Sequence, residues 1–138
     1  MVVTQELTLR TQGHTDIEEI TSLVQETVAT SGLTPGIVTV FCPGSTGGLT
    51  TIEHESGVVT DLQRAFEAIA PEDGVYQHHL RWGDNNGSAH VRAALVGPSL
   101  TVPFVKGRLT LGAWQQIVFL DFDTCPRTRR LVVQVMGE

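Results

Sequence analysis

The C-terminal third of the chain is dense in β-branched and aromatic residues, with a turn signal in its middle. Residues 100–124 read LTVPFVKGRLTLGAWQQIVFLDFDT, and residues 129–137 read RRLVVQVMG. Lys106-Gly107 separates two of these runs and predicts a β-hairpin, because such dipeptides suit a tight turn between strands. This third of the chain therefore has to form antiparallel sheet, and the rest must supply the elements that pack on it.

The N-terminal half alternates between strand and helix patterns. Residues 3–10, 36–43 and 49–53 predict strands by their alternation and β-branched content. Residues 14–32 have a helical period, with Thr15 or Asp16 as the cap and Gly32 at the end. A second helix is predicted over 57–71, where Pro71 stops it. Residues 88–100 fit either a strand or a short helix.

The order strands, helix, strands, helix, strands predicts an α+β fold with mixed, largely antiparallel sheets and two main helices. At 138 residues the chain has the size of one core, so residues 1–138 are taken as a single domain.

Composition narrows the class of partner. A net charge of −6 argues against nucleic acid and anionic membranes, which attract clustered Lys and Arg. Charged residues are only 17%, which favours a homo-oligomer that buries part of the surface. No stretch is apolar enough to span a bilayer and no signal peptide is visible, so a cytoplasmic location is expected. Cys42 and Cys125 each precede a Pro and are expected to be free thiols.

Three of the five histidines fall within YQHHLRWGDNNGSAH, residues 76–90, which is interpreted as a loop. Neutral imidazole is the commonest metal ligand, so His78, His79 and His90 are candidate ligands. Neighbouring histidines on an extended segment point to opposite faces, so only one of His78 and His79 is expected to face His90. Glu53 is the candidate fourth ligand. The alternative is that these histidines bond to the backbone, stack on Trp82 or line a subunit interface.

CPGSTGG, residues 42–48, resembles a loop that binds an anion through its backbone. Glycines let successive N–H groups face one ligand, and hydroxyl groups add donors. The candidate ligand-binding residues of this loop are Gly44, Ser45, Thr46 and Gly47. The loop lacks the Lys of a Walker A motif, so no nucleotide cofactor is expected. A plain tight turn is the alternative. Arg81 and Arg92 are candidate phosphate partners.

Several longer runs occur in a recognisable order: TTIEHES, YQHH, DNNGSAHVRAALVGPSLTVP, GRLTLGAWQQIVFLDFD and PRTRRLVVQV. With them the chain resembles the YjbQ-like family, described as secondary thiamine-phosphate synthases. The resemblance runs from about residue 5 to residue 137. It implies an α+β homotrimer with a pocket rich in histidine and carboxylate near a subunit boundary.

The resemblance also implies functional residues. Glu53, Asp61, Asn86 and His90 stand at family positions, and either His78 or His79 matches the family's first histidine. The expected catalytic set is Glu53, Asp61, His79, Asn86 and His90. One departure is visible, because Gly44-Ser45-Thr46 stands where many members have His-Thr-Thr or His-Thr-Ser.

The resemblance and these residues lead to three hypotheses of function. The first, which the resemblance implies, is a weak thiamine-phosphate synthase that joins hydroxymethylpyrimidine diphosphate to a thiazole phosphate, with a divalent metal, Zn or Mg. The second is a metal-dependent hydrolase or lyase, with zinc on His79, His90 and Glu53 and with Asp61 as base or supporting carboxylate. The third is a trimeric protein that binds a small anion without turnover.

Overall fold

The computed structural model describes residues 1–138 and contains two antiparallel sheets and four helices. The strands are β1 Val2–Thr11, β2 Asp16–Glu19, β3 Gly36–Phe41, β4 Gly47–Ile52, β5 Ser99–Val105, β6 Arg108–Leu109, β7 Gln116–Asp121 and β8 Arg127–Gly137. The helices are α1 Thr21–Ser31, α2 Ser56–Ile69, α3 Gln77–Trp82 and α4 Gly87–Val96. The α+β prediction is confirmed, and every strand pair is antiparallel.

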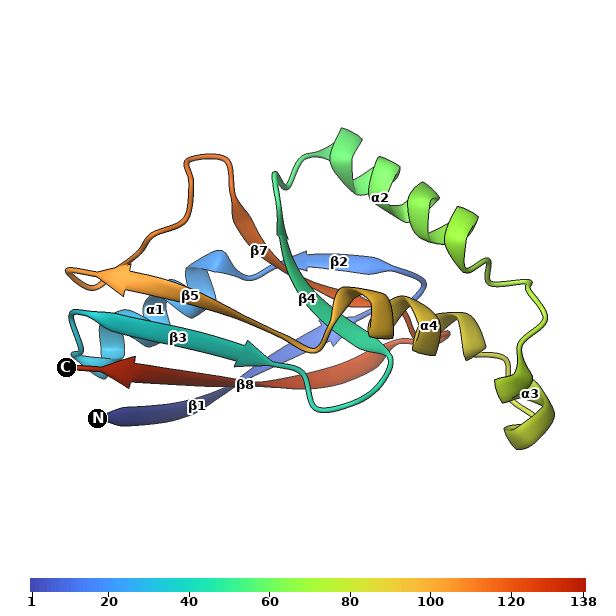
Figure 1. Cartoon of the computed structure of the whole chain (residues 1–138), viewed down its shortest axis with the longest axis horizontal. Coiled ribbons are helices and arrows are strands. Elements are labelled where there is room, and N and C mark those ends of the chain that lie inside the picture. The colour runs from blue at the N-terminus through green and yellow to red at the C-terminus, as the bar shows by residue number, and fades with distance from the viewer.

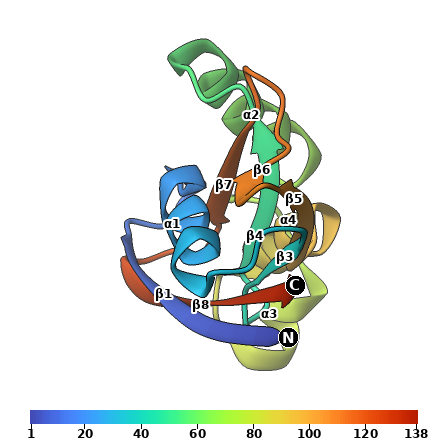
Figure 2. The ribbon, with the colours of Figure 1, turned by 90° about the vertical axis from the view of Figure 1, so that its left-hand side faces the viewer.

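The five-stranded sheet has the order β1-β8-β3-β5-β6, and the three-stranded sheet has the order β2-β7-β4. Helix α1 lies against the five-stranded sheet, on the side that faces β7 (Figure 2). Helix α4 packs on β4, on the other side of the three-stranded sheet. Helix α2 lies above α4 in the view of Figure 1. None of the helices has the length and hydropathy of a membrane-spanning segment.

Strand β7 is the partition between two hydrophobic cores. Ile117 and Phe119 face the larger core with α1 and the five-stranded sheet, whereas Val118 and Leu120 face the smaller core with α2 and α4. All four side chains are fully buried, which the two-residue period of a strand permits only when both faces of the sheet are covered.

Two local predictions are confirmed and one is wrong. The hairpin at Lys106-Gly107 joins β5 to β6, with φ of 52° and 74°, as a primed turn requires. Gly32 ends α1 in the left-handed conformation. The first helix, however, does not begin at Thr15 or Asp16, because residues 16–19 pair with β7 as β2. Strand pairing outweighs the local helical period there.

The largest difference from the prediction lies in residues 76–90. They are not a loop: residues 77–82 form α3, and residue 87 begins α4. The segment that fitted either a strand or a helix is helical up to Val96, and β5 starts at Ser99.

Candidate functional site

Helices α3 and α4 are joined tightly by His79 and Gly87. The imidazole Nε2 of His79 accepts a hydrogen bond of 3.1 Å from the Gly87 backbone N–H, so it caps the start of α4. A Cβ at Gly87 would lie 2.6 Å from the Cβ of Tyr76. Only glycine therefore permits this approach of the two helices.

His78 and His90 form the centre of a polar cluster. Their ring centroids are 4.4 Å apart. The Nε2 of His78 lies 3.0 Å from Asn86 Oδ1 and 3.1 Å from Asp84 Oδ1. Because both neighbours are oxygen acceptors, Nε2 of His78 carries the proton.

Burial lowers the pKa of His90, and the nearby charge of His78 lowers it further, although Asp84 and Asp123 act in the opposite direction. The imidazole of His90 is therefore mainly neutral at pH 7 and can donate or accept a hydrogen bond without a net charge.

Ser88 lies in the first turn of α4 beside this cluster. It is only 1% exposed, yet neither its backbone N–H nor its hydroxyl forms a hydrogen bond within the chain. Free N–H groups and the positive end of the helix dipole make such a helix start suited to an anion.

The helix explains which of the paired histidines meets His90. Residues 78 and 79 are separated by about 100° around a helix axis rather than lying on opposite faces of a strand. His78 meets His90 and Asn86, while His79 faces Tyr76, at 5.3 Å between ring centroids, and the start of α4.

Glu53 and Asp61 are not brought to this cluster. Glu53 follows Ile52, which pairs with Gln116 at the start of β7, whereas Asp121 at the end of β7 pairs with Gly47. The length of β4 separates the two ends, roughly 17 Å for six residues, and the end that leads to Glu53 lies far from α3 in Figure 1. Asp61 is exposed on α2.

The four predicted metal ligands, His78, His79, His90 and Glu53, therefore do not meet within one chain. His79 Nε2 already accepts the Gly87 N–H, and Glu53 is at the opposite end of β4. No group of three or more His, Cys, Asp or Glu side chains in the chain is arranged to hold a metal ion.

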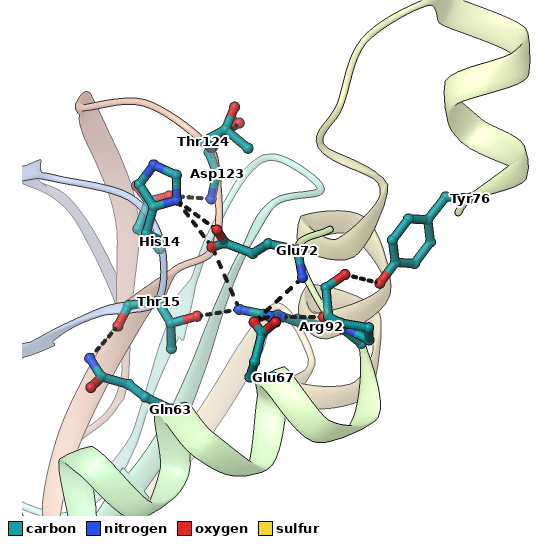
Figure 3. Close-up of polar contacts among 12 residues, drawn as sticks. His14, Thr15, Gln63, Glu67, Glu72, Tyr76, Arg92, Asp123 and Thr124 are labelled. Atoms are coloured by element: carbon teal, nitrogen blue, oxygen red, sulfur yellow. Dashed lines mark hydrogen bonds and ion pairs between the residues drawn. The ribbon is translucent and has the colours of Figure 1, made fainter. Parts of the chain in front are cut away.

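Arg92, a predicted phosphate partner, has its guanidinium enclosed by the chain itself. Figure 3 shows its guanidinium held between loops and α2: it donates to Ala70 O at 2.9 Å, to Thr15 Oγ1 at 2.8 Å and to Glu67 at 2.8 Å. Only 2% of Arg92 is exposed. The residue connects α4 to the end of α2 and to the loop before β2, so its role here is structural. Arg81 lies at the surface, 5.4 Å from the ring centre of Trp82.

His14 is part of the same region and was not singled out from the sequence. Its Nδ1 lies 3.0 Å from Glu72, and both His14 and Thr15 have positive φ, 54° and 62°. Non-glycine residues rarely adopt this conformation. The His14 N–H donates to Asp123 O at 2.7 Å, which holds the turn in place. The one signal in the sequence was Gly13, which indicates a turn immediately before His14 and Thr15 but gives no role to either residue.

The predicted anion-binding loop, residues 42–48, contacts a network of buried charged side chains. Arg129 donates to both oxygens of Asp121, at 2.7 and 2.8 Å, and to Thr46 Oγ1 at 2.8 Å. Thr46 in turn donates to Asp123, which also accepts from Arg127 at 2.7 Å. These aspartates were missed, although FLDFD places carboxylates between buried apolar residues at the end of β7.

Both aspartates of this network are ionised at neutral pH. Burial by itself would raise the pKa of Asp121, but hydrogen bonds from Arg129, Thr11 and the Asp123 backbone outweigh it, so the pKa lies below its usual value. The pKa of Asp123 is lowered in the same way, because Arg127, the Thr124 backbone and Thr46 outweigh burial.

The predicted site residues do not line a cavity of the single chain. The concave spaces of the chain are lined by other residues. The largest, of about 610 Å³, includes Gln25, Leu33 and Leu109.

Fold and cluster together define an α+β protein with two stacked antiparallel sheets and a histidine cluster at one helix start. The chain belongs to the family described as UPF0047 protein YjbQ-like, whose model matches residues 5–138. A UPF0047 protein of Methanothermobacter thermautotrophicus is 41% identical over 137 residues, 99% of this chain and 94% of that protein. One from Archaeoglobus fulgidus is 39% identical over 131 residues, 95% of this chain and 99% of that protein.

Solved structures agree with this assignment. A YbjQ-like protein of unknown function from Sulfolobus solfataricus superposes with a TM-score of 0.95 at 28% identity, over 100% of this chain and 99% of that one. A YjbQ/UPF0047 family protein from Clostridium acetobutylicum has a TM-score of 0.88 at 34% identity, over 96% of this chain and 99% of that one.

Proposed function

We propose that this chain is a weak thiamine-phosphate synthase, which joins hydroxymethylpyrimidine diphosphate to a thiazole phosphate and releases pyrophosphate. The observation that carries the proposal is the start of α4, where Ser88 has unpartnered donors beside His90 and His78. The reaction needs donors for the oxygens of the departing pyrophosphate more than it needs a nucleophile. The resemblance to secondary thiamine-phosphate synthases supports the identity of the substrates.

In this reaction the thiazole nitrogen forms a C–N bond to the pyrimidine methylene carbon, and the C–O bond to the diphosphate breaks. The bonding electrons go to the diphosphate oxygen. The Ser88 N–H and hydroxyl stabilise that charge, together with the positive end of α4. His90, mainly neutral, adds a further N–H. Asn86 and Asp84 fix the ring of His78, which packs against His90.

We propose that a divalent metal binds only together with the diphosphate of the substrate. Mg²⁺ is usually held by one or two carboxylates plus substrate phosphates, and Asp84 is the carboxylate next to His78. The hydrolase alternative has less support, because it needs Glu53 beside His90 in a zinc site and the two lie apart in one chain.

We also propose that the chain works as a homotrimer, with the histidine cluster near a subunit boundary. Large apolar side chains on the two helices that carry the cluster are exposed: Leu80 is 76% and Trp82 is 65% exposed on α3, and Leu95 is 62% exposed on α4. Clustered exposed apolar residues favour a protein interface. A second subunit over α3 and α4 would also exclude water from a site that is open in one chain.

The test is thiamine phosphate formation by the purified, untagged protein with Mg²⁺, comparing wild type with His90→Ala and Ser88→Ala. Loss of one oxyanion donor typically costs 10²–10³-fold in kcat, so a fall of at least about tenfold is expected in each variant. His54→Ala is the matched control, because His54 is an exposed histidine outside the cluster.

Product formation at equal rates in wild type and His90→Ala would overturn the proposed site. Tight retention of the diphosphate with no turnover would replace the synthase by the binding protein of the third hypothesis. Elemental analysis and oligomer mass, measured on the same samples, test the metal and the trimer.

A further inference from the structure

Arg129 has a donor that nothing in the chain uses. Its side chain is 5% exposed, and its Nε and Nη2 are fully engaged by Asp121 and Thr46. The remaining nitrogen, Nη1, forms no hydrogen bond within the chain. No buried side-chain nitrogen of the chain lacks a hydrogen-bond partner, so Nη1 is the guanidinium nitrogen that reaches solvent. Its N–H groups are free to donate to a ligand oxygen.

This free nitrogen faces the turn at Gly44. A Cβ at Gly44 would lie 3.5 Å from Nη1 of Arg129, and no other atom of the surroundings would come within 4 Å. Gly44 has a φ of +134°, which disfavours any side chain there. The absence of a side chain therefore leaves Nη1 accessible from the outer side of the turn.

The turn itself presents further donors. The backbone N–H groups of Gly44, Ser45 and Thr46 form no hydrogen bond within the chain, and the hydroxyl of exposed Ser45 forms none either. Successive free N–H groups in a turn form a concave nest for an anion. Buried Arg129 lies below that nest and adds a formal positive charge.

The surrounding charges decide how such a ligand is recognised. The positive charges of Arg127 and Arg129 are balanced by the negative charges of Asp123 and Asp121, with which they form ion pairs. Because the four charges sum to zero, recognition depends on directed donors rather than on the field of a positive patch. A tetrahedral oxyanion such as a phosphate has enough acceptor oxygens to meet an Arg nitrogen and several N–H groups at once.

We propose that Arg129 Nη1 and the turn Gly44–Thr46 form a subsite for the phosphate monoester of a small substrate. The subsite is separate from the start of α4 but lies near it, because Asp123 contacts Thr46 and also influences the pKa of His90. In the proposed reaction, the start of α4 would bind the diphosphate that departs. The subsite at Arg129 would bind the phosphate monoester that the product retains. The assignment of a substrate to this subsite rests on the proposed function. The presence of an oxyanion site at Arg129 does not depend on it.

The first measurement is titration of the full-length protein with inorganic phosphate at low ionic strength, followed by NMR shifts of the Gly44–Thr46 amides and the Arg129 side chain. Saturable shifts confined to these groups are expected. Gly44→Ala places a methyl group against Nη1 while keeping the Arg129–Asp121 pair, and Arg129→Lys keeps the charge but removes the fork. Each is expected to raise the Kd for phosphate about tenfold or more, as the loss of a charged hydrogen bond does.

Gly97→Ala is the matched control. Gly97 also has a positive φ, +98°, and a Cβ there would meet nothing within 4 Å, so it tests the strain alone. Equal phosphate affinity in wild type, Gly44→Ala and Arg129→Lys would overturn the subsite, and so would the absence of saturable shifts at the turn. A loss of affinity equal in Gly97→Ala and Gly44→Ala would overturn it as well.

Steady-state kinetics separate this inference from the proposed function. If thiamine phosphate forms, Gly44→Ala should raise KM for thiazole phosphate but leave KM for the unphosphorylated thiazole alcohol unchanged. A synthase whose two KM values do not change would refute the subsite and leave the function standing. Phosphate bound at Arg129 without any synthase activity would refute the function and leave the subsite standing.

Discussion

The rings of His78 and His90 pack with their centroids 4.4 Å apart, and Nε2 of His78 is turned toward Asp84 and Asn86. Two imidazoles this close disfavour each other's protonation, so one ring holds its proton more tightly than the other. His90 is the ring whose pKa is lowered, mainly because it is partly buried.

We therefore expect His90 to titrate below the ordinary histidine value of about 6.5. Burial is the main cause and the charge of His78 the next. NMR titration of the imidazole Cε1–H signals measures this directly. In His78→Asn the midpoint of His90 should rise, since one repulsive charge is gone, whereas His54→Ala should leave it unchanged. A midpoint of His90 above the ordinary histidine value of about 6.5 would contradict the assignment.

The lowered pKa of His90 also makes the stability of the protein depend on pH. The unfolded chain binds the proton more tightly than the folded one, so the free energy of unfolding rises with pH through the window just below 6.5. Urea denaturation at pH 5 and pH 7 should show the wild type less stable at pH 5. His90→Ala should lose most of that difference.

Asp121→Asn is expected to destabilise the protein by about 3–5 kcal/mol, because it leaves the buried Arg129 charge without its partner. Asp121 is fully buried, whereas Asp61 is exposed on α2 and Asp61→Asn is the matched control. Chemical denaturation at pH 7 measures both. A loss below about 1 kcal/mol in Asp121→Asn would mean that this ion pair contributes little to stability.

The contribution of Asp121 to stability also falls with falling pH, but its cause is the hydrogen bonds to the carboxylate rather than burial. Its pKa is lowered in the folded state, so the stabilisation is present above the ordinary aspartate value of about 3.9 and is lost as pH falls below it. Acid unfolding followed by circular dichroism should be less steep in Asp121→Asn than in the wild type.

Arg92→Met tests the structural role found for a residue that the sequence marked as a phosphate partner. Removing the guanidinium leaves Ala70 O and Thr15 Oγ1 without a donor, and unsatisfied buried groups cost about 1–3 kcal/mol each. We expect a loss of about 2–4 kcal/mol, and for exposed Arg81→Met a change within about 0.5 kcal/mol. A stable Arg92→Met protein with weakened phosphate binding would restore the ligand role.

The two cysteines should differ in reactivity. Cys125 is exposed, whereas Cys42 is buried and burial raises the pKa of its thiol. Because the thiolate is the reactive form, a maleimide should label Cys125 quickly and Cys42 only after unfolding. Mass spectrometry of native and urea-treated protein counts the labels. Rapid double labelling of the native protein would contradict the buried position of Cys42.

The sequence by itself determined the fold class, most of the strands and the long helix α2, because these depend on local periodicity and turn residues. It also singled out the histidines at 78, 79 and 90 and the glycines around residue 44, on which the proposed sites rest. Tight turns such as Lys106-Gly107 were predictable for the same reason, since their geometry is set by the residues within them.

Only the tertiary structure decided which of these residues meet. Strand pairing with β7 turned residues 16–19 into β2 instead of a helix start, and the helical form of α3 selected His78 rather than His79 as the neighbour of His90. The length of β4 separated Glu53 from the histidines, and packing of α2 on α4 enclosed Arg92. Arg129 and Gly44 are 85 positions apart in the sequence, and only the pairing of distant strands brings them together. Contacts of this kind depend on packing between distant segments, which no local pattern encodes.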